Sequence, residues 1–501
     1  MNRDRKLYLE WHILFLLLSF YCFCFATHFK FQFGSLKFMD HYQLQANGFY
    51  FLKPFLLSFD GGAPPAIDTS IYGGRPYGVY GPLPSIFQLL LNNILKLDIP
   101  SSAIVFTLTL SCLYAFFWLG KTFFEEILEL NRKWAVTLSA LICSAIAITD
   151  RFLQNVVVGF SWTQASVTSQ LFLILSFIFF LKFLSKEKKK FLFWSGLFYG
   201  FACLGKQNYL LGFIPTAIFI IYKFKKKALS KLKFYLSPIL GAFILNCIWN
   251  FIRFKNPFDS GLLYVNATEI NPNHATMPQF HRIPYNFFNH FLSLAKFDTK
   301  DFPLLSGQTS PFGGMNLQTG AGGLLHNFQM ISMFVSSPIL LVLPIFCSWL
   351  LWEYFFNGRK LNELDKWWIY LMGTNFFVFF YYLITDSSWS RYQFDIWFLS
   401  YLGTALVLVR WFGWLKKIHQ VELRKGSFIF CTLTLIFSIF TGLDQTMGLL
   451  VNRTNPFIYK EAYRMPSDQK LTYKVCLMRS AFFRLNENCY GEVYLGTSSN
   501  F

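Results

Sequence analysis

Acidic residues are scarce in this sequence, and charged residues of either sign are uncommon. The 501 residues include 26 Asp and Glu against 45 Lys and Arg, so charged residues make up 14% and the formal net charge is +19. Soluble domains carry about 25% charged residues, whereas 54% of the residues here are hydrophobic. The composition therefore excludes an ordinary soluble globular domain.

Basic residues are missing from the long apolar runs and gather in the short connections between them. Three such clusters lie at 186–190, 223–227 and 416–417. This is the positive-inside pattern, which predicts cytoplasmic connections that contact anionic lipid. The positive charge therefore indicates membrane topology, and we expect no nucleic-acid partner.

The sequence also lacks cysteines and histidines at the spacing that is typical of metal sites. Most of the ten cysteines lie inside apolar runs, where they serve as small apolar side chains. Cys476 and Cys489 are exceptions, and the sequence leaves open whether they form a disulfide. The histidines of the predicted loops also lack ligand spacing: His41, His274, His281, His290 and His326.

Long apolar runs are what the sequence has in abundance. They predict an all-α, multi-pass membrane protein with about eleven transmembrane helices. The first run follows three basic residues and has no small-residue cleavage site, so we expect an uncleaved helix with a cytoplasmic N-terminus. The predicted helices cover about 10–29, 101–120, 134–149, 161–184, 191–205, 208–222, 234–252, 331–352, 367–384, 394–412 and 427–450.

Residues 83–97 form an apolar run that we do not expect to cross the membrane. If they crossed it, the later lysine clusters would fall on the external side. Ser85, Gln88, Asn92 and Lys96 repeat at helical spacing, and a helix from Ser85 to Leu97 covers about 20 Å of a hydrocarbon core about 30 Å thick. We predict a helix lying flat on the external surface, with its polar face towards water or substrate.

This topology divides the chain into a transmembrane domain, 1–450, and an external tail, 451–501. The domain includes a first external loop, 30–100, and a second long external segment, 253–330. Glycine pairs and prolines in the first loop fix its path rather than extend a helix. A long, shaped loop at a membrane surface favours a functional role.

Three charged patches meet at the external side of this topology. Asp40 and Asp68 lie in the first loop, and the turn TDSSWSRYQFD carries Asp386, Arg391 and Asp395. The third patch combines a turn with Lys206 and a helix exit with Arg253 and Lys255. Cations that hold a phosphate beside a carboxylate that accepts a proton suit a phosphorylated lipid donor.

Several segments resemble the GT-C superfamily of glycosyltransferases that use polyprenyl-phosphate sugars. The similar segments are Asp40 with HYQLQANGF behind it, DTSIYGGRPYGVYGPLP, GLFYGFACLGKQNY, WNFIRFKNPFDSG and SRYQFDIWFLSYLG. The first-loop segment is similar to the protein O-mannosyltransferase-like and aminoarabinose transferase-like branch. The resemblance covers roughly 1–412 and implies a GT-C-type helical bundle with juxtamembrane helices in the first loop.

The resemblance also implies roles for particular residues. Asp40 is the expected catalytic base, and Asp68 would assist it or orient the loop. Arg391, Lys206 and Arg75 are expected to stabilise the leaving phosphate, and Trp162 and Tyr392 to stack on the sugar. Many members carry a second Asp near the fourth helix, where this sequence reads GFSWTQASVT. Whether a divalent metal, Mg or Mn, binds Asp40, Asp68 or Asp150 is therefore left open.

Each of these residues also has a purely structural alternative. Asp40 is a suitable N-cap for a helix starting at HYQLQ, and Asp68 can order its own turn. Arg391 and Lys206 can be interfacial anchors, and Arg75 can be a solvated turn residue. These alternatives stay open at this point.

The sequence predicts an inverting glycosyltransferase that moves a sugar from a polyprenyl phosphate to a glycan, lipid or protein hydroxyl. Short loops favour a bacterial inner membrane, with the site facing the periplasm. One alternative is a transporter or flippase of lipid-linked sugars, although the internal repeats that many transporters have are not visible. Another is a catalytically inactive GT-C relative.

Overall fold

The computed structural model describes the chain from Arg3 onwards with internal gaps. The described residues are 3–27, 31, 33, 41–57, 70–78, 80–97, 99–158, 161–261, 280–297, 305–307, 331–384 and 390–454. Asp40, Asp68, Cys476, Cys489 and the whole predicted tail beyond Thr454 lie outside them.

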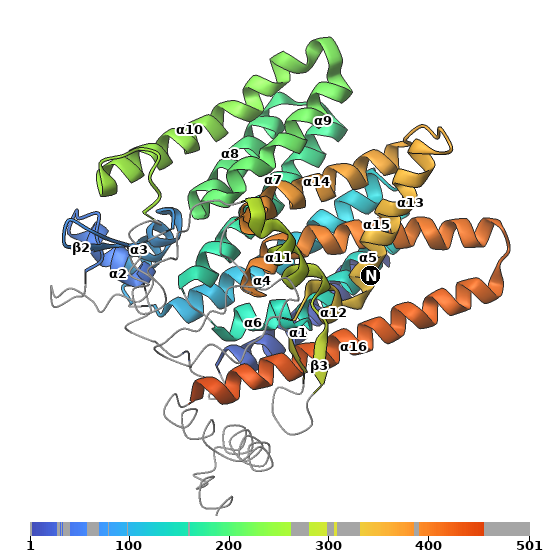
Figure 1. The fold of residues 1–501 in the computed structure, drawn as a ribbon, viewed down its shortest axis with the longest axis horizontal. Coiled ribbons are helices and arrows are strands. Elements are labelled where there is room, and N and C mark those ends of the chain that lie inside the picture. The colour runs from blue at the N-terminus through green and yellow to red at the C-terminus, as the bar shows by residue number, and fades with distance from the viewer. Residues whose placement is uncertain are drawn as a thin grey trace, which may run out of the picture.

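A bundle of long helices dominates the described chain (Figure 1). Within the described residues, eight stretches are long and apolar enough to cross a membrane, or nine if one bent pair counts as a single span. The fold is therefore an all-α multi-pass membrane protein, as predicted. The bundle helices are α1 (Arg3–Ala26), α4 (Ser101–Glu126), α5 (Arg132–Ala147), α7 (Ser161–Lys186), α8 (Lys189–Gly205), α9 (Ile214–Phe224), α10 (Ala228–Phe254), α13 (Val342–Phe355), α14 (Glu363–Ile384), α15 (Phe394–Lys417) and α16 (Val421–Thr454).

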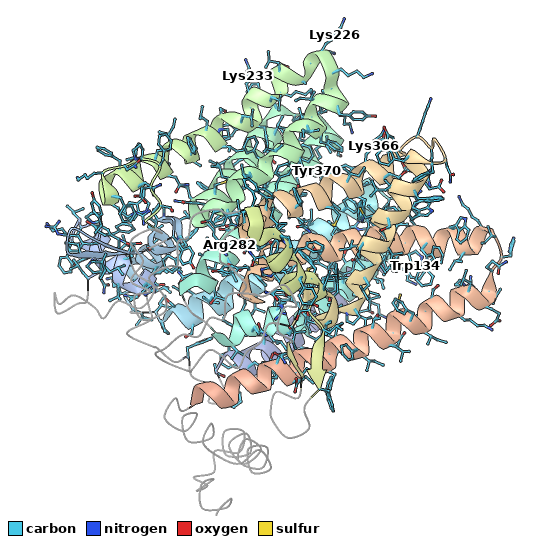
Figure 2. The ribbon with its side chains drawn as sticks, viewed as in Figure 1. Trp134, Lys226, Lys233, Arg282, Lys366 and Tyr370 are labelled. Carbon is cyan, nitrogen blue, oxygen red and sulfur yellow. The ribbon has the colours of Figure 1, made fainter. Side chains whose placement is uncertain are left out.

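One end of the bundle, which we call the lysine end, carries the basic connections. The chain reverses between α9 and α10 through the 3₁₀ turn η2 (Lys225–Lys227), and Figure 2 shows Lys226 projecting outward there. The α7–α8 turn lies beside it, because Glu187 contacts Lys231 at 3.9 Å and Lys189 lies 5.2 Å from the Phe234 ring. Two of the three lysine clusters, 186–190 and 223–227, therefore lie in neighbouring turns.

The opposite end, which we call the hairpin end, carries the first loop. It contains α2 (His41–Tyr50), the antiparallel strands β1 (Ser70–Tyr72) and β2 (Arg75–Tyr77), and α3 (Leu83–Leu95). Gly73 and Gly74 form the two-residue turn with φ of 55° and 73°, a conformation that a glycine pair adopts without strain. Tyr72 and Tyr77 of the strands pack against Phe254 at the end of α10.

Helix α3 has 13 residues, so it spans about 20 Å, too short to cross the hydrocarbon core. It lies at the hairpin end, where the Gln164 amide at the start of α7 donates to the Pro84 carbonyl. The prediction that its polar face meets water or substrate is wrong. Gln88 is fully buried and donates to Gln43 of α2 at 2.6 Å, and Asn92 donates to the same oxygen.

The polar face of α3 turns towards α2 because a neighbouring helix can satisfy its amides. The apolar residues take the outward face, and Ile94 is 72% exposed there. Other apolar side chains exposed on or directly after this helix are Ile86, Leu90, Leu95 and Leu97.

The predicted helix over 134–149 also differs from the structure, which has two helices joined by a bend. Helix α5 ends at Ala147 and α6 (Asp150–Val158) follows at an angle of 61°. Gly442 of α16 fits into this bend, since a Cβ there would lie 2.2 Å from the Ile148 carbonyl oxygen. The bend places Asp150 and Arg151 inside the bundle instead of at its surface.

Short elements make up the described parts of the second long segment. They are η4 (Phe280–Arg282), α11 (Ile283–Phe287), η5 (Phe288–Leu292), β3 (Ala295–Phe297), β4 (Leu305–Gly307), α12 (Met333–Ser336) and η6 (Pro338–Leu341). Strands β3 and β4 pair antiparallel. Asp444 of α16 accepts a hydrogen bond from the Leu305 amide, so the segment is fastened to α16. The domain boundary at 450 stays a prediction.

This arrangement makes a topology prediction. Lys96, exposed after α3, and Lys226 lie at opposite ends of the bundle. A membrane-impermeant maleimide added to sealed vesicles should therefore label Lys96→Cys and Lys226→Cys from opposite sides. The described native cysteines are buried or half-buried, and Cys476 and Cys489 are replaced by serine in both variants. Labelling of both positions from one side would mean that α3 crosses the membrane.

Candidate functional site

A buried ion pair joins two helix ends at the hairpin end. Lys206 follows Gly205 at the C-terminus of α8, and Asp395 lies in the first turn of α15. The Lys206 Nζ lies 2.7 Å from Asp395 Oδ2, and both residues are buried. The 189 positions between them explain why sequence reasoning did not pair them.

Hydroxyl groups complete the shell of this ion pair. Tyr209 and Tyr382 donate to the Asp395 carboxylate at 3.1 and 2.6 Å, and Lys206 donates to Ser166 at 2.7 Å. A charge pair withdrawn from water is tolerated only when its remaining hydrogen-bonding capacity is satisfied in this way. The pair thus fixes the ends of α8 and α15 and the turn that leads into α9.

Two tyrosine rings form a wall beside the lysine. Tyr382 and Tyr392 stack with ring centroids 4.2 Å apart, and the Lys206 Nζ lies 5.2 and 5.1 Å from the two centroids. The structure therefore brings together two of the predicted substrate-binding residues, Lys206 and Tyr392. The lysine already interacts with Asp395, so its charge is largely compensated within the protein.

The segment that carries Arg391 is held from two sides. It forms the 3₁₀ turn η7 (Ser390–Gln393), which runs directly into α15. On one side Tyr392 contacts Lys206; on the other, Gln393 accepts a bond from Arg151 at 2.5 Å and donates to the His290 carbonyl at 2.9 Å. Both anchors directly follow Arg391 in the chain, and the side chain of Arg391 is outside the described part.

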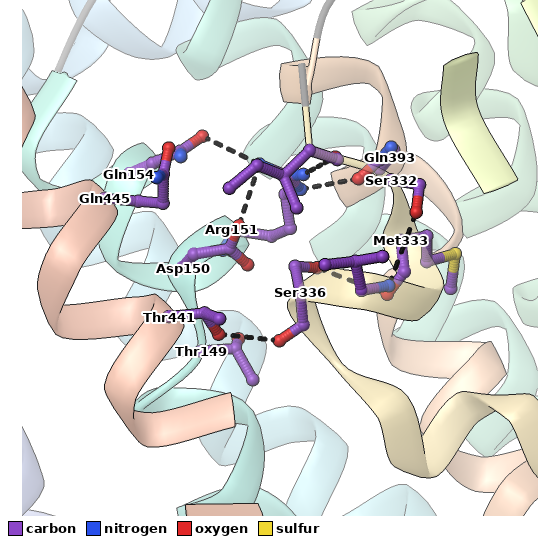
Figure 3. A network of polar contacts seen from close by, with 12 residues as sticks. Thr149, Asp150, Arg151, Gln154, Ser332, Met333, Ser336, Gln393, Thr441 and Gln445 are labelled. Carbon is purple, nitrogen blue, oxygen red and sulfur yellow. Dashed lines mark hydrogen bonds and ion pairs between the residues drawn. The ribbon is translucent and has the colours of Figure 1, made fainter. Parts of the chain in front are cut away.

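Asp150 and Arg151 form a second buried charge pair, with Nη1 2.9 Å from Oδ2 (Figure 3). Arg151 also donates to Gln154 at 3.3 Å and to the Ile331 carbonyl. Thr441 of α16 donates to the Ser336 carbonyl in the same network. The pair therefore connects α6 with η7 and the start of α12.

The Asp150 carboxylate therefore pairs with Arg151 and is not free to bind a metal cation. Among the described residues, no group of three or more His, Cys, Asp or Glu side chains is arranged to hold a metal ion. Asp40 and Asp68 are not among those residues, so the metal question remains untested.

The other predicted residues lie as follows. Helix α2 begins at His41, directly after Asp40, and the roles of Asp40 as a helix cap or a base stay predictions. Arg75 is exposed on β2 and lies over the Phe55 ring at 5.0 Å. Trp162 is in the first turn of α7, one turn before Ser166, and its side chain is not described.

Comparisons with known proteins identify the fold. No protein-family model matches the chain, and no curated protein sequence matches it. The apo crystal structure of the Archaeoglobus fulgidus oligosaccharyltransferase is similar, with a TM-score of 0.50 and 12% identity over 93% of this chain. The match spans only 59% of that protein.

A second structure of oligosaccharyltransferase AglB from the same organism, in complex with an inhibitory peptide and a dolichol-phosphate, gives a TM-score of 0.43 at 12% identity. It covers 94% of this chain and 59% of that protein. The first likeness shows that this chain shares the fold of that oligosaccharyltransferase.

The Lys206–Asp395 pair makes a stability prediction. Lys206→Met or Asp395→Leu alone leaves one buried charge without its partner, which costs about 3–5 kcal/mol. The double variant removes both charges and should recover most of that loss. Thermal unfolding in detergent measures the effect, with Lys425→Met at the exposed Lys425–Glu422 pair as the control. A double variant no more stable than the single variants would contradict the coupling.

Proposed function

We propose that this protein is a membrane glycosyltransferase that moves a sugar from a polyprenyl-phosphate donor to an acceptor hydroxyl at the hairpin end. The observation that carries the proposal is the GT-C-type fold, in which the motif segments meet at one end of the bundle. Helix α2 starts after Asp40, η7 carries Arg391, and Lys206 contacts Tyr392 at this end.

The proposed reaction is a single inverting displacement. The acceptor oxygen forms a bond to the anomeric carbon while the bond from that carbon to the phosphate oxygen breaks. Asp40 takes the proton of the acceptor hydroxyl. The polyprenyl phosphate departs with the bonding electrons, and fixed positive charge beside it lowers the barrier.

The cations of the site differ in how much charge they offer to that phosphate. Lys206 is paired with Asp395 at 2.7 Å, so its role is chiefly to hold Tyr392 and η7 in place. Arg391 is the cation we assign to the leaving group, because its turn is anchored on both sides. Arg75 is exposed on the hairpin and would act at the outer rim.

Asp68 either orients the first loop or shares a divalent metal, Mg or Mn, with Asp40. Asp150 does not fit such a metal, because its carboxylate lies 2.9 Å from the Arg151 guanidinium. A metal held by Asp40 and Asp68 would add positive charge near the phosphate.

We further propose that the hairpin end faces outward and the lysine end faces the cytoplasm. The lysine clusters favour this orientation, and short connections between spans suit a bacterial inner membrane. The acceptor is a glycan, a lipid or a protein. The bend between α5 and α6 would also suit a transporter of lipid-linked sugars, but Asp150 and Arg151 beside it are paired with each other.

Sugar release tests the proposal directly. Purified protein is incubated with a panel of polyprenyl-phosphate sugars and acceptors, and the liberated lipid phosphate is measured. At least one donor should be consumed, and Asp40→Asn should lower transfer about a hundredfold or more by removing the base. The variant's thermal midpoint should match that of the wild type. Undiminished transfer by folded Asp40→Asn would remove the base from the mechanism.

Arg391 provides a test of donor recognition. Arg391→Ala should raise the donor KM or lower kcat with the donor, while the acceptor KM changes little, because its charge acts on the phosphate. Loss of one charged hydrogen bond corresponds to about tenfold or more. Arg424→Ala, at an exposed position near the lysine end, is the matched control. Unchanged donor kinetics would exclude this role.

A further inference from the structure

Arg253 is a completely buried arginine without an ionic partner. It lies in the last turn of α10, at the hairpin end, and is 1% exposed. Among the described residues no carboxylate lies within ion-pair distance of it. Asp259 interacts with it at longer range, and Asp259 Oδ1 already accepts a bond from the Gly261 amide at 2.8 Å.

The two terminal nitrogens of this guanidinium have neutral partners. One donates to the Gly78 carbonyl in the first loop, and the other donates to Asn250 Oδ1 at 2.7 Å. The Trp249 and Phe254 ring centroids lie 4.9 and 4.6 Å from its central carbon. These contacts orient the guanidinium, and none of them carries a negative charge; Asp259 acts on the buried cation only at longer range.

Three buried donors in and around Arg253 have no hydrogen-bond partner in the described part of the chain. They are the Arg253 Nε, the Tyr42 hydroxyl and the Trp249 Nε1. Tyr42 belongs to the first turn of α2 and is close enough to Arg253 for their charges to interact. Burial raises the pKa of Tyr42 well above its ordinary value, so its hydroxyl keeps the proton that it can donate.

Unpaired buried donors are uncommon, and each one costs about 1–3 kcal/mol. The Tyr42 and Trp249 donors, beside a buried cation whose own Nε is also unpaired, are explained by an anionic oxygen group that belongs at this place. The ring of Trp249 also contacts Phe49, so α2 and α10 enclose the donors together. Helix α2 begins directly after Asp40, so Tyr42 follows the proposed base by two residues in the chain.

We propose that Arg253, Tyr42 and Trp249 form an anion site that binds the phosphate of the polyprenyl donor. The choice of ligand rests on the proposed function. The same donors would also fit a carboxylate of the chain itself, and the binding experiment separates the two sources. If the donor is the ligand, Arg253 and Arg391 contact one phosphate from two sides of the hairpin end.

Binding of farnesyl monophosphate, a short polyprenyl phosphate, tests this site without any transfer reaction. The affinity of purified protein in detergent is measured by calorimetry, with farnesol and inorganic phosphate as competitors. Wild-type protein should bind farnesyl phosphate, and farnesol should not displace it. Inorganic phosphate should compete only at higher concentration, whereas equal affinity for it would mean that the site is not for lipid phosphate.

Tyr42→Phe is the decisive variant, because the hydroxyl it removes has no partner in the described structure. It should leave the thermal midpoint unchanged or raised, yet weaken farnesyl phosphate binding about fivefold. Arg253→Met should weaken binding about tenfold or more. Tyr235→Phe, at an equally buried tyrosine nearer the lysine end of α10, is the matched control and should bind as wild type does.

Equal affinity of wild type and Tyr42→Phe would overturn the proposal, and so would equal affinity of wild type and folded Arg253→Met. Either result would mean that a carboxylate of the chain, or no anion, occupies the site. Transfer activity with unchanged binding would leave the proposed function intact while removing this site. If binding depends on Tyr42 but no sugar is transferred, the anion site is supported and the proposed glycosyltransferase function is not.

Discussion

Charge compensation in a water-poor interior governs the hairpin end of this molecule. Among the described residues, the buried cations Lys206 and Arg151 each have a carboxylate within 3 Å, whereas buried Arg253 has none. Since an unpaired charge in such surroundings is strongly unfavourable, each pair must form for its helices to close. In a chain with so few acidic residues, two of them are used for this purpose.

The two charge pairs act on the same short segment from opposite sides. Lys206 with Asp395 fixes the start of α15, and Arg151 with Gln393 fixes the turn before it. The backbone of Arg391 is therefore held before any ligand arrives. Preorganised charge of this kind is effective because no reorganisation is needed when the substrate binds. The polar contacts of the hairpin end thus combine a structural role with a proposed catalytic one.

Sequence patterns were sufficient to predict the helices of the bundle, but they were not sufficient to predict the polar contacts between those helices. Apolar runs and lysine clusters located the long helices, and residues 83–97 contain the short helix α3 that the sequence predicts. That α3 lies on the membrane surface instead of crossing it stays a prediction. The direction of its polar face was predicted wrongly, because nothing local reveals that Gln43 of α2 receives Gln88 and Asn92.

The same limit applies to the site. Lys206 and Tyr392, both predicted to bind substrate, lie side by side, whereas the partners of Lys206 and Arg253 depend on contacts across 189 and 175 positions. The sequence places Arg253 in a basic patch at a helix exit but does not reveal its burial or its neutral partners. No periodicity or spacing in a single sequence encodes such contacts, since they arise from how the helices pack. The α5–α6 bend is similar, because it depends on the close fit of Gly442 against Ile148.

Helix α3 turns its polar side towards α2 and its apolar side outward, which bears on how deeply the hairpin end would lie in a membrane. Its amides are satisfied by α2, and its outward side is lined by Ile86, Leu90, Ile94 and Leu95. An amphipathic helix with such an apolar side is suited to the boundary between headgroups and acyl chains. We expect α3 to lie at this boundary and thereby to hold the charged groups of the hairpin end near the phosphates of the surrounding leaflet.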